Sequence, residues 1–181
     1  MLRTQTEHLL ALHDALTDHI HQLDEDVKRA ANGNAVVKQL TTIPGVGVFS
    51  ALFLQADIGS ITRCRSSHVL AAYAGLVPTT RSSGGKTAHG GLGKANNRWL
   101  KWILVELVVT RKLAPGPVGT YYRHLLRAKG KPKAQAAAAR KLCCYLFWML
   151  KHDWTYAEWL QQHVNTERSE VRPMQRMGTM A

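Results

Sequence analysis

The chain has 181 residues, of which 45% are hydrophobic and 20% charged, and it carries a formal net charge of +12. This length and composition predict a globular protein with a real core, in one domain or one domain with an extension. Three cysteines without CxxC or Cys–His spacing exclude a disulfide framework and a structural zinc site, so we expect a reducing cytoplasm and no metal. The longest apolar run is too short to span a bilayer, and we expect no membrane partner.

The positive charge is unevenly distributed along the chain. Residues 1–30 hold three Lys/Arg and six Asp/Glu, which leaves 21 basic and six acidic residues for the remainder. Between Ile58 and His152 there are 17 Lys/Arg and one acidic residue, Glu106. This asymmetry favours a surface that binds DNA or RNA over a merely solvated basic face.

The first segment is an amphipathic helix within residues 1–34. Its apolar residues recur in steps of three and four: Leu9, Leu12, Leu16, Ile20, Leu23 and Val27. The steps approximate a heptad seam, so a coiled coil and a plain helix packed on its own domain both remain open. Asn-Gly-Asn at 32–34 ends the helix.

Residues 36–59 predict two helices joined by the tight turn IPGVG, in a helix-hairpin-helix-like arrangement. Glycine lets backbone N–H groups at a helix N-terminus approach a phosphate closely. Gly45 and Gly47 are therefore candidate contacts to a nucleic-acid backbone. The alternative is an ordinary glycine turn between helices.

Further helices are expected over residues 66–76, 97–113, 120–130, 131–153 and 155–164. The second half of the segment 131–153 is fully apolar and should be buried. We therefore predict a mainly α fold, with a compact helical domain over residues 35–164 and a disordered tail over 165–181. The only strands suggested are a short pair flanking a loop at 79–92.

That loop, with the residues that follow it, reads TTRSSGGKTAHGGLGKANN and contains hydroxyls, glycines and cations but no carboxylate. It lacks the glycine spacing and the preceding strand of a nucleotide-binding P-loop. Ser82 and Ser83 lie between Arg81 and Lys86, and cations in such positions stabilise charge on a phosphate attacked by a hydroxyl. The residues alone leave a catalytic loop and a solvated basic loop open, and they supply no carboxylates for Mg²⁺.

Five motifs occur in a characteristic order: IPGVG, LAAYAGLVP, SSGGK, a Gly-x-Gly-Lys turn, and Asn-Arg-x-Leu at the start of a long helix. From about Lys38 to about Leu160 the chain resembles the C-terminal transposase domain of the insertion-sequence one-ten type. Those transposases combine a RuvC-like half, which has four metal-binding carboxylates, with a coiled coil and a serine-bearing domain guided by a bridge RNA. The resemblance implies a DNA partner, a guide RNA, and either a homo-oligomer or association with a RuvC-like domain.

Carried over by position, the resemblance implies that Ser83, or as second choice Ser82, is the nucleophile of DNA strand exchange. It implies nucleic-acid contacts at a further set of residues: Arg81, Lys86, Lys94, Asn97 and Arg98. Residues 1–30 would match the end of the coiled coil. The sequence departs from the family pattern in GGLGKANN, where Asn96 replaces a glycine.

The carboxylate-bearing half is not encoded in these residues. We expect Mg²⁺ only in that half, no cofactor on this chain, and no transposition by this chain alone. The chain would be a truncated copy, a fragment of an interrupted gene, or a separate DNA-binding protein in the bacterial nucleoid. The alternative function is a non-catalytic nucleic-acid-binding protein. Among the tryptophans, Trp99 alone is expected to be placed for base stacking.

Overall fold

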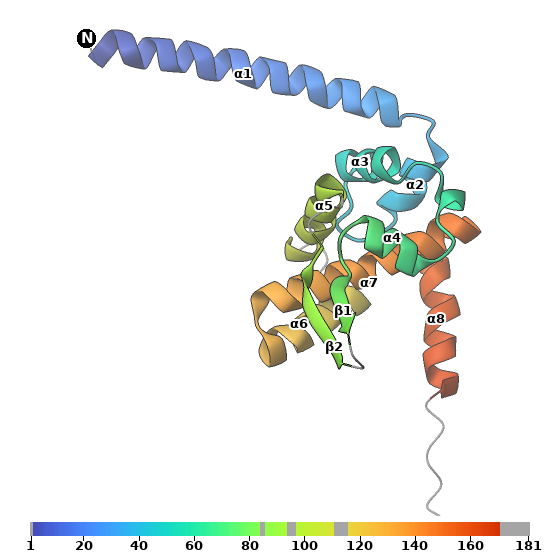
Figure 1. Cartoon of the computed structure of the whole chain (residues 1–181). Helices are drawn as coiled ribbons and strands as arrows, with labels where there is room; N and C mark the ends of the chain where they lie inside the picture. Colours follow the sequence, from blue (N-terminus) through green and yellow to red (C-terminus); the bar gives the residue numbers. More distant parts are fainter. Residues whose placement is uncertain (1, 84–85, 94–96, 111–115, 171–181) are drawn as a thin grey trace, which may run out of the picture.

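The computed structural model describes residues 2–83, 86–93, 97–110 and 116–170, and the mainly α fold predicted from the sequence is confirmed (Figure 1). The helices are α1 (Leu2–Ala31), α2 (Ala35–Thr41), α3 (Val48–Ile58), α4 (Ser67–Tyr73), α5 (Arg98–Val109), α6 (Pro117–Lys129), α7 (Lys131–His152) and α8 (Tyr156–Glu170), with a 3₁₀ turn at Ile61–Arg63. The strands are β1 (Pro78–Ser83) and β2 (Lys86–Leu92).

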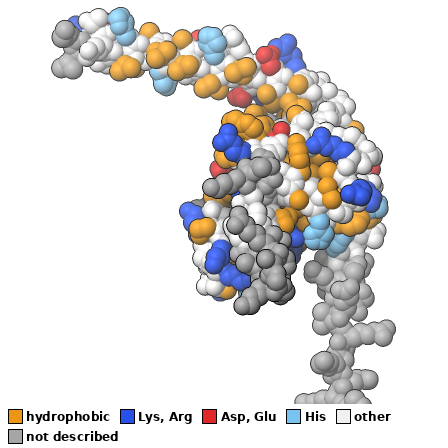
Figure 2. Space-filling model, viewed as in Figure 1, with side chains coloured by type: hydrophobic (Ala, Val, Ile, Leu, Met, Phe, Trp, Pro, Cys, Tyr) orange, Lys and Arg blue, Asp and Glu red, His pale blue; other side chains and the backbone are white. Residues whose placement is uncertain are grey.

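Helix α1 extends away from the rest of the molecule as a long arm (Figure 1). It contacts α3 and ends at Ala31, which is buried, and Gly33 follows with a φ of 75° that favours glycine. Its predicted apolar stripe is exposed along most of the arm (Figure 2), from 55% at Leu16 to 66% at Leu9, whereas Val27 near the body is partly buried. Within this chain the arm is therefore not packed on its own domain along that stripe.

Helix α7 is the centre of the core, and it packs against α4, α5, α6 and α8. Pro132 lies in its first turn, where a missing N–H costs nothing because that group has no helical partner. Leu142, Leu146 and Phe147 are almost completely buried, as the apolar run predicts. Burial of this run removes apolar area from water and so contributes to the driving force for folding of the body.

Helix α2 is tied to the corner between α7 and α8. The buried Gln39 side chain donates hydrogen bonds to the carbonyl oxygens of Met149 and Trp154, at 2.8 and 3.0 Å. The Thr42 hydroxyl accepts a hydrogen bond from the backbone N–H of Tyr156 at 2.9 Å. These bonds satisfy backbone groups at the helix ends and fix the chain just before the IPGVG turn.

The serine-rich segment is a β-hairpin rather than an irregular loop between helices. β1 and β2 pair antiparallel, and the pair of residues Gly90 and Gly91 faces the single residue Thr79, which makes a β-bulge. The Thr79 hydroxyl donates to the Gly91 carbonyl oxygen at 3.0 Å, and a Cβ at Gly90 would collide with the Thr79 side chain. The sequence suggested a short strand pair flanking a loop at 79–92, and the pair exists, but its strands occupy that segment instead of flanking it.

Helix α8 continues to Glu170, beyond residue 165 where the tail was expected to begin. Residues 171–181 lie outside the described residues. The division into an amphipathic helix, a helical domain and a tail stays a prediction.

Candidate nucleic-acid interface

The hairpin places the predicted nucleophiles at the end of β1. Ser83 pairs with Lys86 and Ser82 pairs with Thr87, so both serines lie within two positions of the turn. Arg81 pairs with Ala88 one step further from the turn. The pairing of β1 with β2 therefore places Ser83 directly opposite Lys86 across the turn. Lys94, another predicted contact, lies outside the described residues.

Asn97 joins the hairpin to α5 and caps that helix. Its Oδ1 accepts hydrogen bonds from the backbone N–H groups of Trp99 and Leu100, both at 3.0 Å. Its Nδ2 donates to the Tyr73 hydroxyl at 3.2 Å, and its backbone N–H donates to the Tyr73 carbonyl oxygen at 3.1 Å. Sequence reasoning missed this positioning role, although an Asn immediately before a helix is a typical N-cap signal.

Arg98 follows at the start of α5, and it is exposed. Trp99 beside it is 67% exposed, as its predicted position next to the loop requires. Trp102 is also 48% exposed, and it packs against Phe53 and Trp99. It follows Trp99 by nearly one helical turn, so both tryptophans lie on the same outward side of α5.

The turn between α2 and α3 has the predicted helix-hairpin-helix form. Ile43 and Val46 are buried and anchor it, while Gly45 adopts a φ of 91° that favours glycine. Gly47 is the N-cap of α3, and a Cβ built on it meets nothing within 4 Å. The described part of the chain therefore gives no steric reason for glycine at position 47, and no side chain caps α3.

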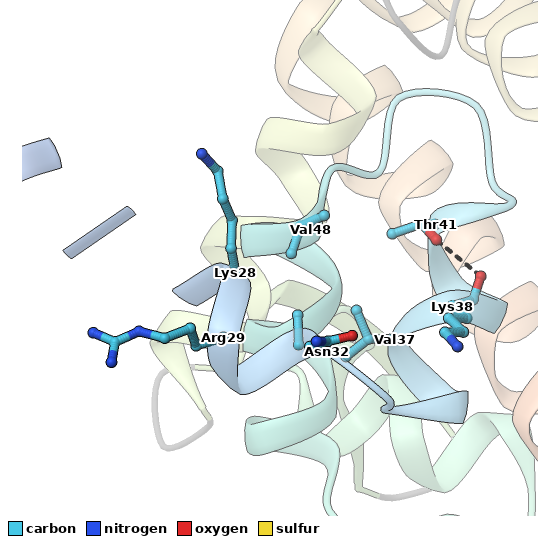
Figure 3. A pocket seen from close by; sticks show the side chains of 8 residues that line it. Lys28, Arg29, Asn32, Val37, Lys38, Thr41 and Val48 are labelled. Atoms are coloured by element: carbon cyan, nitrogen blue, oxygen red, sulfur yellow. Dashed lines mark hydrogen bonds between the residues drawn. The ribbon is translucent and has the colours of Figure 1, made fainter. Parts of the chain in front are cut away.

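An open groove of about 380 Å³ lies where α1, α2 and α3 meet (Figure 3). It is lined by Lys28, Arg29, Ala31, Asn32, Val37, Lys38, Thr41 and Val48. Lys28 and Arg29 extend away from the other labelled side chains and form ion pairs with Glu25 and Asp26. The lining contains no carboxylate, so the groove offers no acid–base pair for catalysis.

Two titratable groups differ in what they can contribute to chemistry. Burial raises the pKa of the Cys143 thiol well above its ordinary value, so this cysteine is not a nucleophile at neutral pH. The hydrogen bond and charge of Lys28 lower the pKa of Glu25, which keeps this exposed pair ionised.

Among the described residues, no three His, Cys, Asp or Glu side chains are grouped to hold a metal ion. The side chains described here do not fit Mg²⁺, and we assign no metal-dependent step to them.

Comparisons with known proteins define the class of this domain. Residues 37–123 match the model of the transposase IS116/IS110/IS902 family. The chain is 30% identical over 152 residues to the transposase for insertion sequence element IS1111A of Coxiella burnetii, covering 82% of this chain and 41% of that protein. It is 33% identical over 146 residues to the insertion element IS110 uncharacterized 43.6 kDa protein of Streptomyces coelicolor, covering 80% and 36%.

A third relative, the transposase for insertion sequence element IS1328 of Yersinia enterocolitica, is 31% identical over 91 residues. These matches identify an IS110-type transposase domain within this chain, as its motifs indicate. It spans 41% and 36% of the lengths of the first two relatives. No helix in the described ranges has the length and hydrophobicity needed to cross a membrane.

Proposed function

We propose that this chain binds DNA and supplies the serine nucleophile for strand exchange in transposition of an insertion sequence. The observation that carries the proposal is the hairpin register, which sets Ser83 beside Lys86 at the end of β1 in a transposase-family domain. The net charge of +12 supports a polyanionic substrate. The chain would act in the bacterial cytoplasm, on the nucleoid.

The register favours Ser83 over Ser82. In that register Ser83 pairs with the cation Lys86, whereas Ser82 pairs with Thr87. A hydroxyl paired with a cation is suited to an attack on phosphate, because the cation stabilises the charge that develops there.

The proposed step is a transesterification. The serine oxygen attacks a backbone phosphorus and forms a phosphoserine ester, while the bond between that phosphorus and one deoxyribose oxygen breaks. The proton lost by the serine is balanced by the proton gained by the released deoxyribose hydroxyl. Attack by a hydroxyl of a second strand reverses the chemistry, joins the new strand and restores the serine.

The remaining contacts would hold the DNA or guide-RNA backbone. Gly47 and Gly45 would let the turn before α3 approach a phosphate, and Arg98 would supply charge beside the hairpin. Lys94 is proposed for the same role on sequence grounds. Asn97 would act by positioning the hairpin and α5, because its side chain is already engaged in capping.

Strand cleavage would require a partner that carries the RuvC-like carboxylates. We propose that a homo-oligomer, or association with such a domain, completes the site, and that a guide RNA selects the DNA. This chain alone would bind DNA without exchanging strands, since the side chains described here include no metal-binding group.

The test mixes the full chain with a full-length transposase of the family whose own serine is replaced by alanine, and with labelled element-end DNA. Denaturing gels then reveal covalent protein–DNA adducts of this chain. Ser83→Ala should abolish the adduct, and Ser82→Ala and the control Ser60→Ala should retain it. Persistence of the adduct in the Ser82→Ala, Ser83→Ala double variant would refute the catalytic role.

A non-catalytic nucleic-acid-binding protein is the second candidate. The long basic stretch with Glu106 as its single acid favours it, because phosphate contacts alone give binding. It predicts an affinity for duplex DNA that falls steeply with salt and does not change in the double serine variant. No adduct would form with any full-length partner.

A further inference from the structure

Four aromatic side chains form a continuous row across α3 and α5. The ring centroids of Phe49 and Phe53 are 6.0 Å apart, those of Phe53 and Trp102 are 6.3 Å apart, and those of Trp102 and Trp99 are 6.4 Å apart. Phe53 is partly buried and packs against the core, so it fixes the row to the body. We call these four residues the aromatic row.

The aromatic row faces solvent over most of its length. Phe49 is 54% exposed, Trp102 is 48% exposed and Trp99 is 67% exposed. Isolated exposed apolar side chains are common, but adjoining large aromatics on two neighbouring helices mark an interaction surface. Helices α3 and α5 contact each other directly, so the row is held by the rigid part of the fold rather than by a loop.

The charges around the row favour a polyanionic ligand. Arg98 and Lys101 lie on α5 beside the two tryptophans, and at the other end Phe49 lies in the first turn of α3, which no side chain caps. The backbone N–H groups of such a turn carry partial positive charge. Glu106, the one acidic residue of the long basic stretch, is on α5 a turn beyond Trp102.

The rings of the row contact one another at a tilt or edge-on. Neighbouring centroids are 6.0 to 6.4 Å apart with interplanar angles of 41°, 72° and 89°, which is the usual geometry of aromatic contacts, so bases would stack on the exposed outer faces and not between the rings. Exposed aromatic side chains with cations beside them are the usual platform for a single strand, whose bases stack on the side chains while its phosphates meet the cations.

We propose that the aromatic row binds the unstacked bases of a single-stranded DNA or RNA segment. This inference rests on the proposed function, because it names a second contact between the same domain and its nucleic acid. Trp99 is the principal stacking residue, since it is the most exposed ring and follows directly after the hairpin segment. A second copy of α1, whose exposed stripe is apolar and acidic, is the rival occupant that the test separates.

The experiment measures fluorescence anisotropy of labelled oligonucleotides of about 16 nucleotides titrated with the full chain. The probes are a thymidine strand, a uridine RNA strand, an abasic strand with the same phosphates, and a duplex. Trp99→Ala and Phe49→Ala are compared with Trp148→Ala, an exposed aromatic on α7. Because all three side chains are surface-exposed, each variant should fold, and circular dichroism checks this.

Trp99→Ala should weaken binding of the base-bearing strands about tenfold, as loss of one stacked base predicts, and leave the abasic strand unchanged. Trp148→Ala should change neither. A larger effect on the thymidine strand than on the uridine strand would assign the row to DNA, and the reverse to RNA. Phe49→Ala should have a smaller effect of the same kind.

The inference is overturned if Trp99→Ala weakens the abasic strand as much as the thymidine strand, because the residue would then not read bases. It is also overturned if the variant reduces self-association in sedimentation and leaves strand affinity unchanged, since the row would then be a protein interface. If duplex binds and the base-bearing strands bind no better than the abasic strand, the inference fails while the proposed function stands. If no probe binds, the proposed function fails with it.

Discussion

Helices α1 and α7, of 30 and 22 residues, are the two longest within the described part of the chain, and both place apolar side chains at helical spacing. In α7 these side chains are almost completely buried, because α4, α5, α6 and α8 surround the helix. In α1 the apolar side chains of the stripe from Leu9 to Leu23 are more than half exposed and only Val27 of the stripe is partly buried, because only the C-terminal end of the helix meets the body (Figure 1). Apolar periodicity thus predicts that a face will be covered, but not whether the same chain covers it.

The arm and the body also differ in the distribution of charged residues. The arm holds six acids in residues 1–30 and pairs several of them with its own cations, as in Arg3–Glu7. The body carries a large excess of positive charge. The arm is therefore suited to a protein partner and the body to a nucleic acid.

The largest predicted effect compares one leucine from each helix. Leu146→Ala should lower the free energy of unfolding by about 2–5 kcal/mol, because it leaves a cavity in the core of α7. Leu16→Ala should change it by less than about 0.5 kcal/mol in the monomer, because its side chain is 55% exposed. Urea denaturation at low protein concentration measures both. Equal losses would contradict the contrast between arm and body.

The next prediction concerns what covers the arm. If a second copy of α1 packs on the exposed stripe, the chain should associate as its concentration rises in sedimentation. The Leu16→Asp, Leu23→Asp double variant should abolish this association, because charges on the seam would be buried unpaired. His21→Asp, on the side of α1 opposite the leucine stripe, is the control for added charge. Association that survives the double variant would place the interface elsewhere.

The starts of α3 and α5 give a smaller, local contrast. Asn97→Ala should lower the free energy of unfolding by about 1 kcal/mol, because two backbone N–H groups of α5 lose their cap. Gly47→Ala should cost less than this, since no capping side chain is lost, its φ of −83° suits any residue and its Cβ meets open space, although alanine is a poorer N-cap than glycine. It should also weaken duplex binding, if the turn approaches a phosphate. A stable Gly47→Ala variant with unaltered affinity would remove that contact.

The smallest effect is expected at the start of α8. Backbone and side-chain hydrogen bonds from Thr155 lower the pKa of the Glu158 carboxyl. A lowered pKa stabilises the folded state above the ordinary glutamate pKa, and this contribution disappears as the pH falls through the lowered value. Glu158→Gln should therefore lower the melting temperature slightly at neutral pH and not in acid. An equal deficit at both pH values would show that ionisation plays no part.

The sequence predicted most of the helical body, and for physical reasons. Asn-Gly-Asn at 32–34, the IPGVG turn and the apolar half of α7 are local signals, and each produced the expected element. The hairpin was less visible, because glycine-rich strands lack the alternation of apolar residues that marks a sheet. The bulge at Gly90 and Gly91 depends on pairing with Thr79, which no local signal contains.

At the candidate site, too, the sequence predicted residues but not the contacts between them. Ser83 and Lys86 were identified from composition and family motif, but their pairing follows from strand register. Asn97 was predicted as a nucleic-acid contact, and its capping of α5 and its bond to Tyr73 emerged only with the fold. The aromatic row joins residues of α3 and α5 that are far apart in sequence, so only Trp99 could be suspected in advance.

Hydrogen exchange of the full chain, with and without duplex DNA, tests most directly whether the hairpin and the glycine turn meet a nucleic-acid backbone. DNA should slow exchange in peptides that cover Pro78–Leu92 and in those that span Gly45 and Gly47, while peptides from the N-terminal half of α1 should not change. Binding that protects only α1 or α8, and leaves the hairpin and turn unaltered, would contradict the account.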